Sequence, residues 1–402
     1  INLINFNTTN VIIMTKMFYN CKSLISLNLL NFDTRNLNLV NSMFYGCSSL
    51  TSLIFNFNTS SITNMNNLFS KCYKLKSLSL ETFDTSQVTN MAYMFNECLS
   101  LTSLNISNFD TSQVLNMEYM FNDCNSLTQI DFNFDTHKVI NMAFMFNKCL
   151  SLKNLSLSNF NIINVINMES MFKDCVSITN LDLSSFKTSL VANVNSMFEG
   201  CFNIESINIE NFDTSNVIDM GKMFKKCSSI ISLKLYKFYT SKAENMEELF
   251  YECSSLTSID LSLFNTNQVT NMKSMFYKCS KISSLNLNNF ITNKVTDMSH
   301  MFDQCISLTS IDLSKFDTSK VKYMDYMFSS CVKLNNIDIS KFNLNKIISM
   351  AYMFNSCKSL FSLEMPKISS SRTLINLSHT FSDCSTLFSL DLSYLDTSSV
   401  LY

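Results

Sequence analysis

Cysteine is the reactive residue that recurs most regularly along the chain. Fifteen cysteines run from Cys21 to Cys384, and successive ones are 25 to 27 residues apart. Zinc sites need clustered ligands, such as Cys-x2-Cys with histidine partners. Each cysteine here is alone in its copy, and the whole chain has only three histidines, His137, His300 and His379. We therefore expect no metal site, and we expect the cysteines to act as small buried apolar side chains.

Hydroxyl and acidic side chains form a second regular set. The fifth residue after each cysteine is serine in eleven copies, and the seventh is often acidic. Like charges in adjacent copies repel, so a solvated face is one interpretation. The other is a binding surface, with a divalent ion between neighbouring acids as a further alternative. The residues predicted to line this surface are Ser258, Asp260, Ser310, Asp312, Asp338, Glu364 and Asp391.

No residue set in the sequence resembles an active site. The chain has no Gly-rich phosphate loop, no Gly-x-Ser-x-Gly and no His-Glu-x-x-His. Its acidic residues recur in the same positions of many copies, whereas an active site would break the repetition at one place. We therefore expect neither an enzyme nor a bound cofactor.

Each copy holds two patterns that predict secondary structure. After Cys98, "LTSLNIS" reads L-x-x-L-x-L, and its last two apolar residues alternate with a polar one as in a half-buried strand. Before it, Met91, Met94, Phe95 and Cys98 lie at i, i+3, i+4 and i+7, which predicts a short helix. Asn90 precedes this segment and could cap the helix. The alternative is a buried asparagine ladder between neighbouring copies.

The period of about 26 residues predicts the architecture. Such strict repetition indicates a solenoid, which we expect to be right-handed, with about fifteen coils, parallel strands on one face and short helices on the other. Residues 1–402 would form this single domain. The segment "FDTSQV" suits an Asx-type turn at Asp84. Stacked cysteines would lie within bridging distance, but their parallel Cβ directions disfavour a disulfide.

The repeated stretch "MFNECLSLTSLNISNFDTSQVTNM" resembles the BspA-like leucine-rich repeats, also described as DUF285 repeats. The resemblance covers essentially the whole chain. It implies a large surface-exposed or secreted protein, and some members of the family are associated with adhesion to matrix proteins or other cells. The expected function is thus recognition of an extracellular protein or glycan through the strand face. The alternative is a structural protein that self-assembles into a filament or surface coat.

Net charge and hydropathy bear on whether the chain binds nucleic acid or spans a membrane. A net charge of −2 gives no reason to expect nucleic acid, and no run of 18 apolar residues predicts a membrane span. The chain starts and stops within a repeat, without the polar end units that a solenoid needs, so we expect a fragment of a longer protein. Glycosylation sequons, which matter only in a secreted eukaryotic protein, occur at Asn7, Asn58, Asn105, Asn154 and Asn376.

Overall fold

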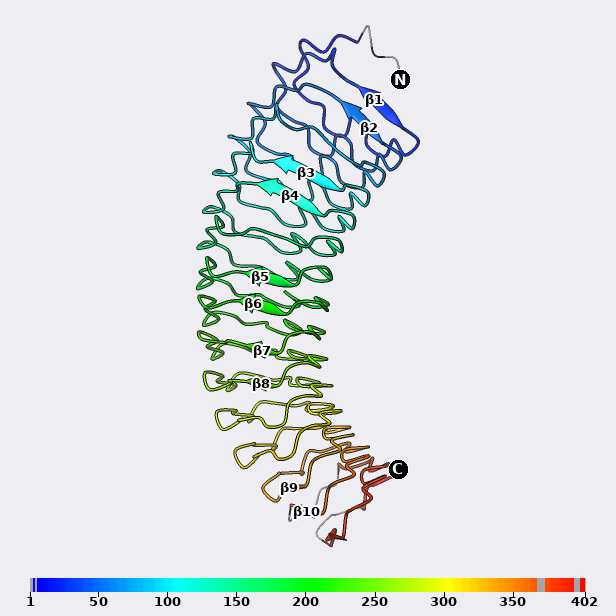
Figure 1. Cartoon of the computed structure of the whole chain (residues 1–402), viewed down its shortest axis with the longest axis vertical. Coiled ribbons are helices and arrows are strands. Elements are labelled where there is room, and N and C mark those ends of the chain that lie inside the picture. Colours follow the sequence, from blue (N-terminus) through cyan, green and yellow to red (C-terminus); the bar gives the residue numbers. More distant parts are fainter. Residues whose placement is uncertain (1–2, 4–5, 367–372, 394–397, 402) are drawn as a thin grey trace. The chain divides into compact units, whose positions relative to one another are not determined.

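The computed structural model describes residues 3, 6–366, 373–393 and 398–401. These residues form two compact units, Ile1–Val191 and Ala192–Tyr402. Within each unit the coils are stacked in sequence order, each on the one before it (Figure 1). The expectation that both units belong to one solenoid domain stays a prediction, as does its right-handed sense.

Short parallel strands mark one side of the coils. The first unit contains β1 (Ser26–Asn28), β2 (Ser52–Ile54), β3 (Ser103–Ile106), β4 (Gln129–Phe132) and β5 (Asn180–Asp182). The second contains β6 (Ser206–Asn208), β7 (Ser232–Leu233), β8 (Ser258–Ile259), β9 (Asn336–Asp338), β10 (Ser362–Glu364) and β11 (Ser389–Leu390).

Strands of successive repeats pair in parallel. Leu27 lies opposite Leu53 in β1 and β2, and Leu363 lies between Ile337 and Leu390 in β9, β10 and β11. Each of these residues is the sixth after its cysteine, so the sequence register is also the strand register. The predicted parallel solenoid is therefore confirmed within each unit.

The prediction of short helices is wrong. No residue that the structure describes is helical, and the segment from Met91 to Cys98 is a run of tight turns. The amide of Met94 bonds the oxygen of Met91 over 3.2 Å, while that of Phe95 bonds Met120 of the next coil over 2.9 Å. An α-helix needs each amide to bond the fourth residue before it. Here alternate amides join neighbouring coils instead.

Left-handed backbone explains why the helical pattern misled. Among the described residues, 28 non-glycine residues have positive φ, including Tyr93 at 60° and Glu97 at 58°. They occupy two positions in each coil, five residues and one residue before the cysteine. Such residues cannot continue a right-handed helix. Successive turns return apolar side chains to the core with a spacing that a helix would also produce.

The asparagine that precedes the turn segment in most coils has a local role. The Asn90 Oδ1 accepts the amide of Ala92 over 3.0 Å, two residues on, as a capping residue would. There is no helix to cap, however, so that interpretation is wrong. The backbone of Asn90 forms parallel bridges with Asn64 and Asn116 in the adjacent coils. At Asn90 the contact between coils is thus made by the backbone, and the side chain fixes the turn. At Asn245 the side chain also contacts the previous coil, where its Nδ2 donates to the Asp219 Oδ1 over 3.0 Å.

Two rows of buried side chains run from coil to coil through the interior. The phenylalanine three residues before each cysteine stacks on the one in the next coil, as Phe95 does on Phe121 with ring centroids 5.6 Å apart. The buried Thr85 donates to the backbone oxygen of Asp110 over 2.8 Å. Sequence reasoning did not assign this role to threonine, although its recurrence after Asp84 and Asp110 was visible. Both rows hold adjacent coils in register.

Candidate binding surface

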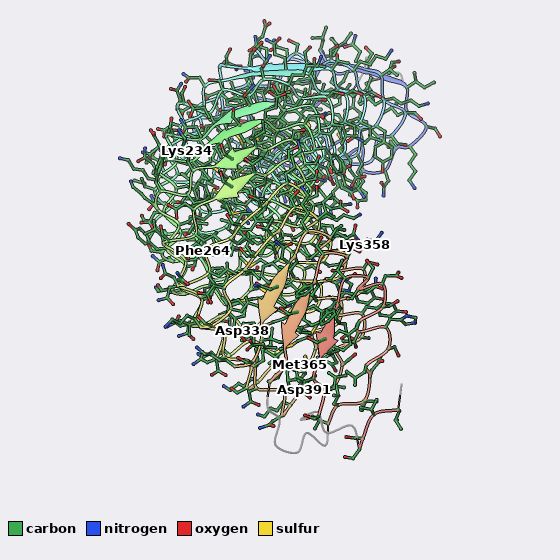
Figure 2. All side chains as sticks on the ribbon, turned by 60° about the horizontal axis from the view of Figure 1, so that its bottom comes forward. Lys234, Phe264, Asp338, Lys358, Met365 and Asp391 are labelled. Carbon is green, nitrogen blue, oxygen red and sulfur yellow. The ribbon has the colours of Figure 1, made fainter. Side chains whose placement is uncertain are left out.

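The predicted surface residues lie on the strand side of the second unit, and all of them are exposed. Ser258 and Asp260 flank Ile259, and Asp338 follows the buried Ile337. Because successive residues of a strand point to opposite faces, the apolar residue anchors the strand while its neighbours face solvent. Figure 2 labels Asp338 and Asp391 beside the strand ribbons of this unit.

The structure brings part of the acidic set together. Asp338 lies directly opposite Glu364, and Asn336 opposite Ser362. Asp391 follows Leu390, the partner of Leu363, and so lies in the next coil beside Glu364. Neighbouring parallel strands are about 4.8 Å apart. The region from β9 to β11 thus presents three successive carboxylates.

Asp312 and Asp260 lie in earlier coils than the three successive carboxylates, and one coil between them carries no acid at this position. Asp312 is one coil before Asp338, and its negative charge opposes ionisation of that residue. Neither Ser310 nor Asp312 lies within an assigned strand. Asn286 occupies the coil between Asp260 and Asp312, so Asp260 is separated from the denser group.

A local hydrogen bond accounts for much of the acidic pattern. The Oδ1 of Asp312 accepts the amide of Ser314 over 2.9 Å, and the Oδ1 of Asp338 accepts that of Ser340 over 2.8 Å. These bonds lower the pKa of both carboxyl groups. Asn105 makes the same bond to Ser107 over 3.1 Å. Aspartate and asparagine are therefore favoured here because they close the turn after the strand, a role the sequence reasoning missed.

Two serines of this surface, Ser258 and Ser310, have no such local role. Ser258 and Ser310 are exposed, and within the described chain their hydroxyl groups make no hydrogen bond to protein atoms. Each hydroxyl is one donor and two acceptor positions available to a partner. Together with the second oxygen of each carboxylate, these groups give the strand side its hydrogen-bonding capacity.

The geometry offers no evident place for a metal ion. Across the residues that the structure describes, no group of three or more His, Cys, Asp or Glu side chains is placed to hold one. The cysteines instead donate to backbone oxygens, as Cys98 does to Phe69 over 3.2 Å. Thirteen of the fifteen are buried, while Cys21 and Cys384 are half-buried. Their predicted burial is thus confirmed except at these two positions.

The sequons differ in accessibility. Asn376 is half-buried, and its Oδ1 accepts the amide of Ser378 over 2.9 Å. The exposed sequon asparagines are Asn7, Asn58, Asn105 and Asn154. Their modification stays an open prediction.

Sequence reasoning missed two features on the turn side of the second unit. His300, Tyr326, Tyr352 and His379 stack in a row, with 4.6 Å between successive ring centroids. A groove also runs beside the cysteines from Phe202 onward. The sequence signal for the aromatic row was an aromatic residue or histidine five positions before several cysteines. The signal for the groove was Phe202 beside Gly200, an uncommon pair in so regular a repeat.

Among the described residues, no helix has the length and apolar character needed to cross a bilayer.

Comparison with solved structures finds leucine-rich-repeat proteins. A leucine-rich repeat protein from Bacteroides ovatus is 18% identical, with 90% of this chain and 85% of that chain covered and a TM-score of 0.36. A leucine rich cell surface protein from Faecalibacterium prausnitzii is 14% identical, with 89% and 84% covered and a TM-score of 0.33. No curated protein matches the chain.

The family comparison is more direct. The model described as "Mycoplasma protein of unknown function, DUF285" matches repeatedly, over residues 1–79, 40–153, 70–182, 128–230, 176–286 and 281–394. Overlapping matches of this kind are what a tandem array of one repeat produces. The resemblance based on the Met-Phe and cysteine positions is confirmed, and the chain belongs to the DUF285 repeat family.

Proposed function

We propose that the protein is a non-enzymatic recognition protein, exposed at the cell surface or secreted, that binds an extracellular protein or glycan through its strand side. The observation that carries the proposal is the exposed row of serine hydroxyls, which runs beside carboxylates that reach their densest arrangement at Asp338, Glu364 and Asp391. The turn geometry explains the acids, but among the described residues no hydrogen bond to the protein explains the hydroxyl groups of Ser258 and Ser310.

The repetition favours an extended partner. Each coil supplies one or two polar groups, and the coils are about 4.8 Å apart. A partner with its own regular groups can contact several coils at once, and many weak contacts then act together. A single small substrate would use only one coil. Matrix proteins, cell-surface proteins and glycans all provide such extended partners.

Binding of the purified 402-residue chain to immobilised matrix proteins and glycans tests this proposal. In the first variant Asp260, Asp312 and Asp338 become Asn, which keeps the turn acceptor and removes the charge. In the second they become Lys, a residue that already occupies this position at Lys234. In a matched control, Asp84, Asp110 and Asp317 become Asn. These aspartates accept the amide two residues on in the Asp-Thr-Ser turn, which is separate from the turn after the strand.

We expect the strand-side variants to weaken binding and the control to leave it unchanged. Equal binding by wild type and the Lys variant would show that the strand side is not the site. If the wild type binds nothing but polymerises in light scattering, self-assembly into a filament or coat is the better function.

A further inference from the structure

A groove in the second unit lies beside the cysteines and apart from the strand side. Its cavity volume is about 360 Å³, and it runs from Phe202 to Ile306 across five successive coils. The lining residues stand immediately before or after a cysteine in each coil. They precede the exposed serines of the strand side by four to six residues, as Ser254 and Glu252 precede Ser258.

One end of the groove departs from the repeat. At Gly200 the residue before the cysteine has no side chain, whereas Lys226, Glu252 and Lys278 occupy that position in the next coils. Phe202, two residues after Gly200, is 41% exposed beside it. An exposed aromatic ring next to a missing side chain leaves its face open to a ligand.

The charged residues of the groove are not all paired. The Lys278 Nζ lies 3.1 Å from the Glu252 Oε1, so these two charges largely cancel. Lys226, one coil before Glu252, has no carboxylate within ion-pair distance among the described residues. The groove therefore offers one ammonium group to an anionic ligand.

Serine hydroxyls and a glutamine supply the neutral polar groups. The Ser228 Oγ donates to the backbone oxygen of Phe202 over 3.2 Å, and the Ser280 Oγ donates to that of Ser254 over 3.3 Å. With their protons so directed, both oxygens keep acceptor positions for a ligand hydroxyl. The coils that contain Ser228 and Ser280 thus each provide an acceptor for a donor carried by the ligand.

The backbone argues against a peptide strand as the occupant. A peptide that extends a sheet needs free amides and carbonyls along an edge. The amides of Lys226 and Glu252 instead donate to Tyr251 and Tyr277 in the next coils, over 2.6 and 2.7 Å. The groove presents side chains rather than an open backbone edge.

We propose that this groove binds a linear anionic oligosaccharide. The coils repeat every 4.8 Å or so, close to the spacing of successive rings in an extended polysaccharide. Successive rings therefore meet successive coils, with hydroxyl groups at Ser228, Ser254 and Ser280 and an amide at Gln304. The Phe202 ring packs against the apolar face of one sugar ring, and Lys226 binds a carboxylate or sulfate group. This site is separate from the strand side and does not depend on the function proposed for it.

Titration calorimetry with oligosaccharides of matched length tests the proposal. The probes are a carboxylated oligogalacturonate, a sulfated heparin fragment and a neutral cello-oligosaccharide. Binding of either anionic probe supports the groove and identifies its acidic group. We expect Lys226→Gln and Phe202→Ala each to weaken binding about tenfold, the effect typical of losing a charge-assisted hydrogen bond or a buried ring contact.

Matched controls exist in the first unit. Lys148→Gln and Leu150→Ala change the same two positions around Cys149, and neither should affect binding. Thermal unfolding midpoints close to that of the wild type establish that the variants are folded. Absence of binding by both anionic probes, equal binding of the neutral probe, or an equal effect of the controls would overturn the proposal. So would loss of oligosaccharide binding in the strand-side Asn variant, which the groove should tolerate.

Discussion

The Cys124 Sγ donates a hydrogen bond of 3.1 Å to the backbone oxygen of Phe95, one coil earlier. The same oxygen accepts the amide of Cys98 over 3.1 Å. Burial raises the pKa of the Cys98 thiol to about 12, so at neutral pH this thiol stays protonated and remains a donor. Cysteine therefore combines a small apolar volume with one donor, which explains its recurrence better than packing alone.

Replacing a thiol in the middle of a unit tests this role. Cys124→Ala removes a donor and leaves a small cavity, and we expect it to lower the free energy of unfolding by about 1–2 kcal/mol. The measurement is urea denaturation followed by circular dichroism. Cys21→Ala is the control, because Cys21 is half-buried and no such bond is described for it. An equal loss in both variants would show that the bond contributes nothing beyond packing.

The state of the thiols is a separate prediction. The denatured protein should release fifteen reactive thiols, and the native protein very few at neutral pH, since burial raises the pKa of Cys253 to about 12. Reaction with a chromogenic disulfide reagent measures both values. A count well below fifteen after denaturation would reveal disulfides.

Residues that recur at the same position of each repeat made much of the fold predictable. The period, the parallel strands and the turn at Asp84 followed from residues that recur in nearly every coil. The turn segments did not, because the spacing of Met91, Met94, Phe95 and Cys98 fits a helix and a run of tight turns equally well. Only backbone geometry separates the two, and Tyr93 gives no sign in the sequence that its φ is positive.

The candidate site was predictable in part for a similar reason. The exposed alternation around Ile259 follows from strand periodicity, so the surface residues were identified correctly as exposed. The Asp338 Oδ1 accepts the amide of Ser340, two residues on, and so closes a turn. In the sequence, an acidic residue repeated at one position of each coil looks the same whether it closes a turn or binds a partner. The groove escaped notice because its signal, Gly200 with Phe202, occurs in one coil rather than in all.

The phenylalanine stack predicts a strong and local effect. Phe224 is fully buried, and its ring centroid lies 5.6 Å from that of Phe198 and 5.8 Å from that of Phe250. Phe224→Ala should cost about 3–5 kcal/mol. Because each coil touches only its neighbours, hydrogen exchange should accelerate most in adjacent coils. Uniform acceleration along the whole chain would contradict this local picture.

Stability should decrease in acid. Hydrogen bonds from Ser86 and Ser319 lower the pKa of Asp84 and Asp317 below the ordinary value of 3.8. A carboxyl group whose pKa is lower in the folded state stabilises the fold above its unfolded pKa, and loses that contribution as pH falls through the folded pKa. The unfolding temperature should therefore drop from about pH 5 to about pH 3. Asp84→Asn with Asp317→Asn keeps the turns and should flatten this slope, and an unchanged slope would exclude these two groups as its cause.

The left-handed positions provide the most selective test of the turn geometry. Ser330 stands immediately before Cys331 with φ of 56°, and Gly46 and Gly200 occupy the same position in other coils. A β-branched residue is strained there, so Ser330→Val should lower the free energy of unfolding by about 1–2 kcal/mol or more. Ser330→Gly removes the strain at some cost in chain entropy and should be neutral or slightly stabilising. A true helix would give a different order, because both glycine and valine would be unfavourable there, glycine the more so. Urea denaturation of the two variants beside the wild type distinguishes the backbones: greater damage from glycine than from valine would mean that this segment is helical after all.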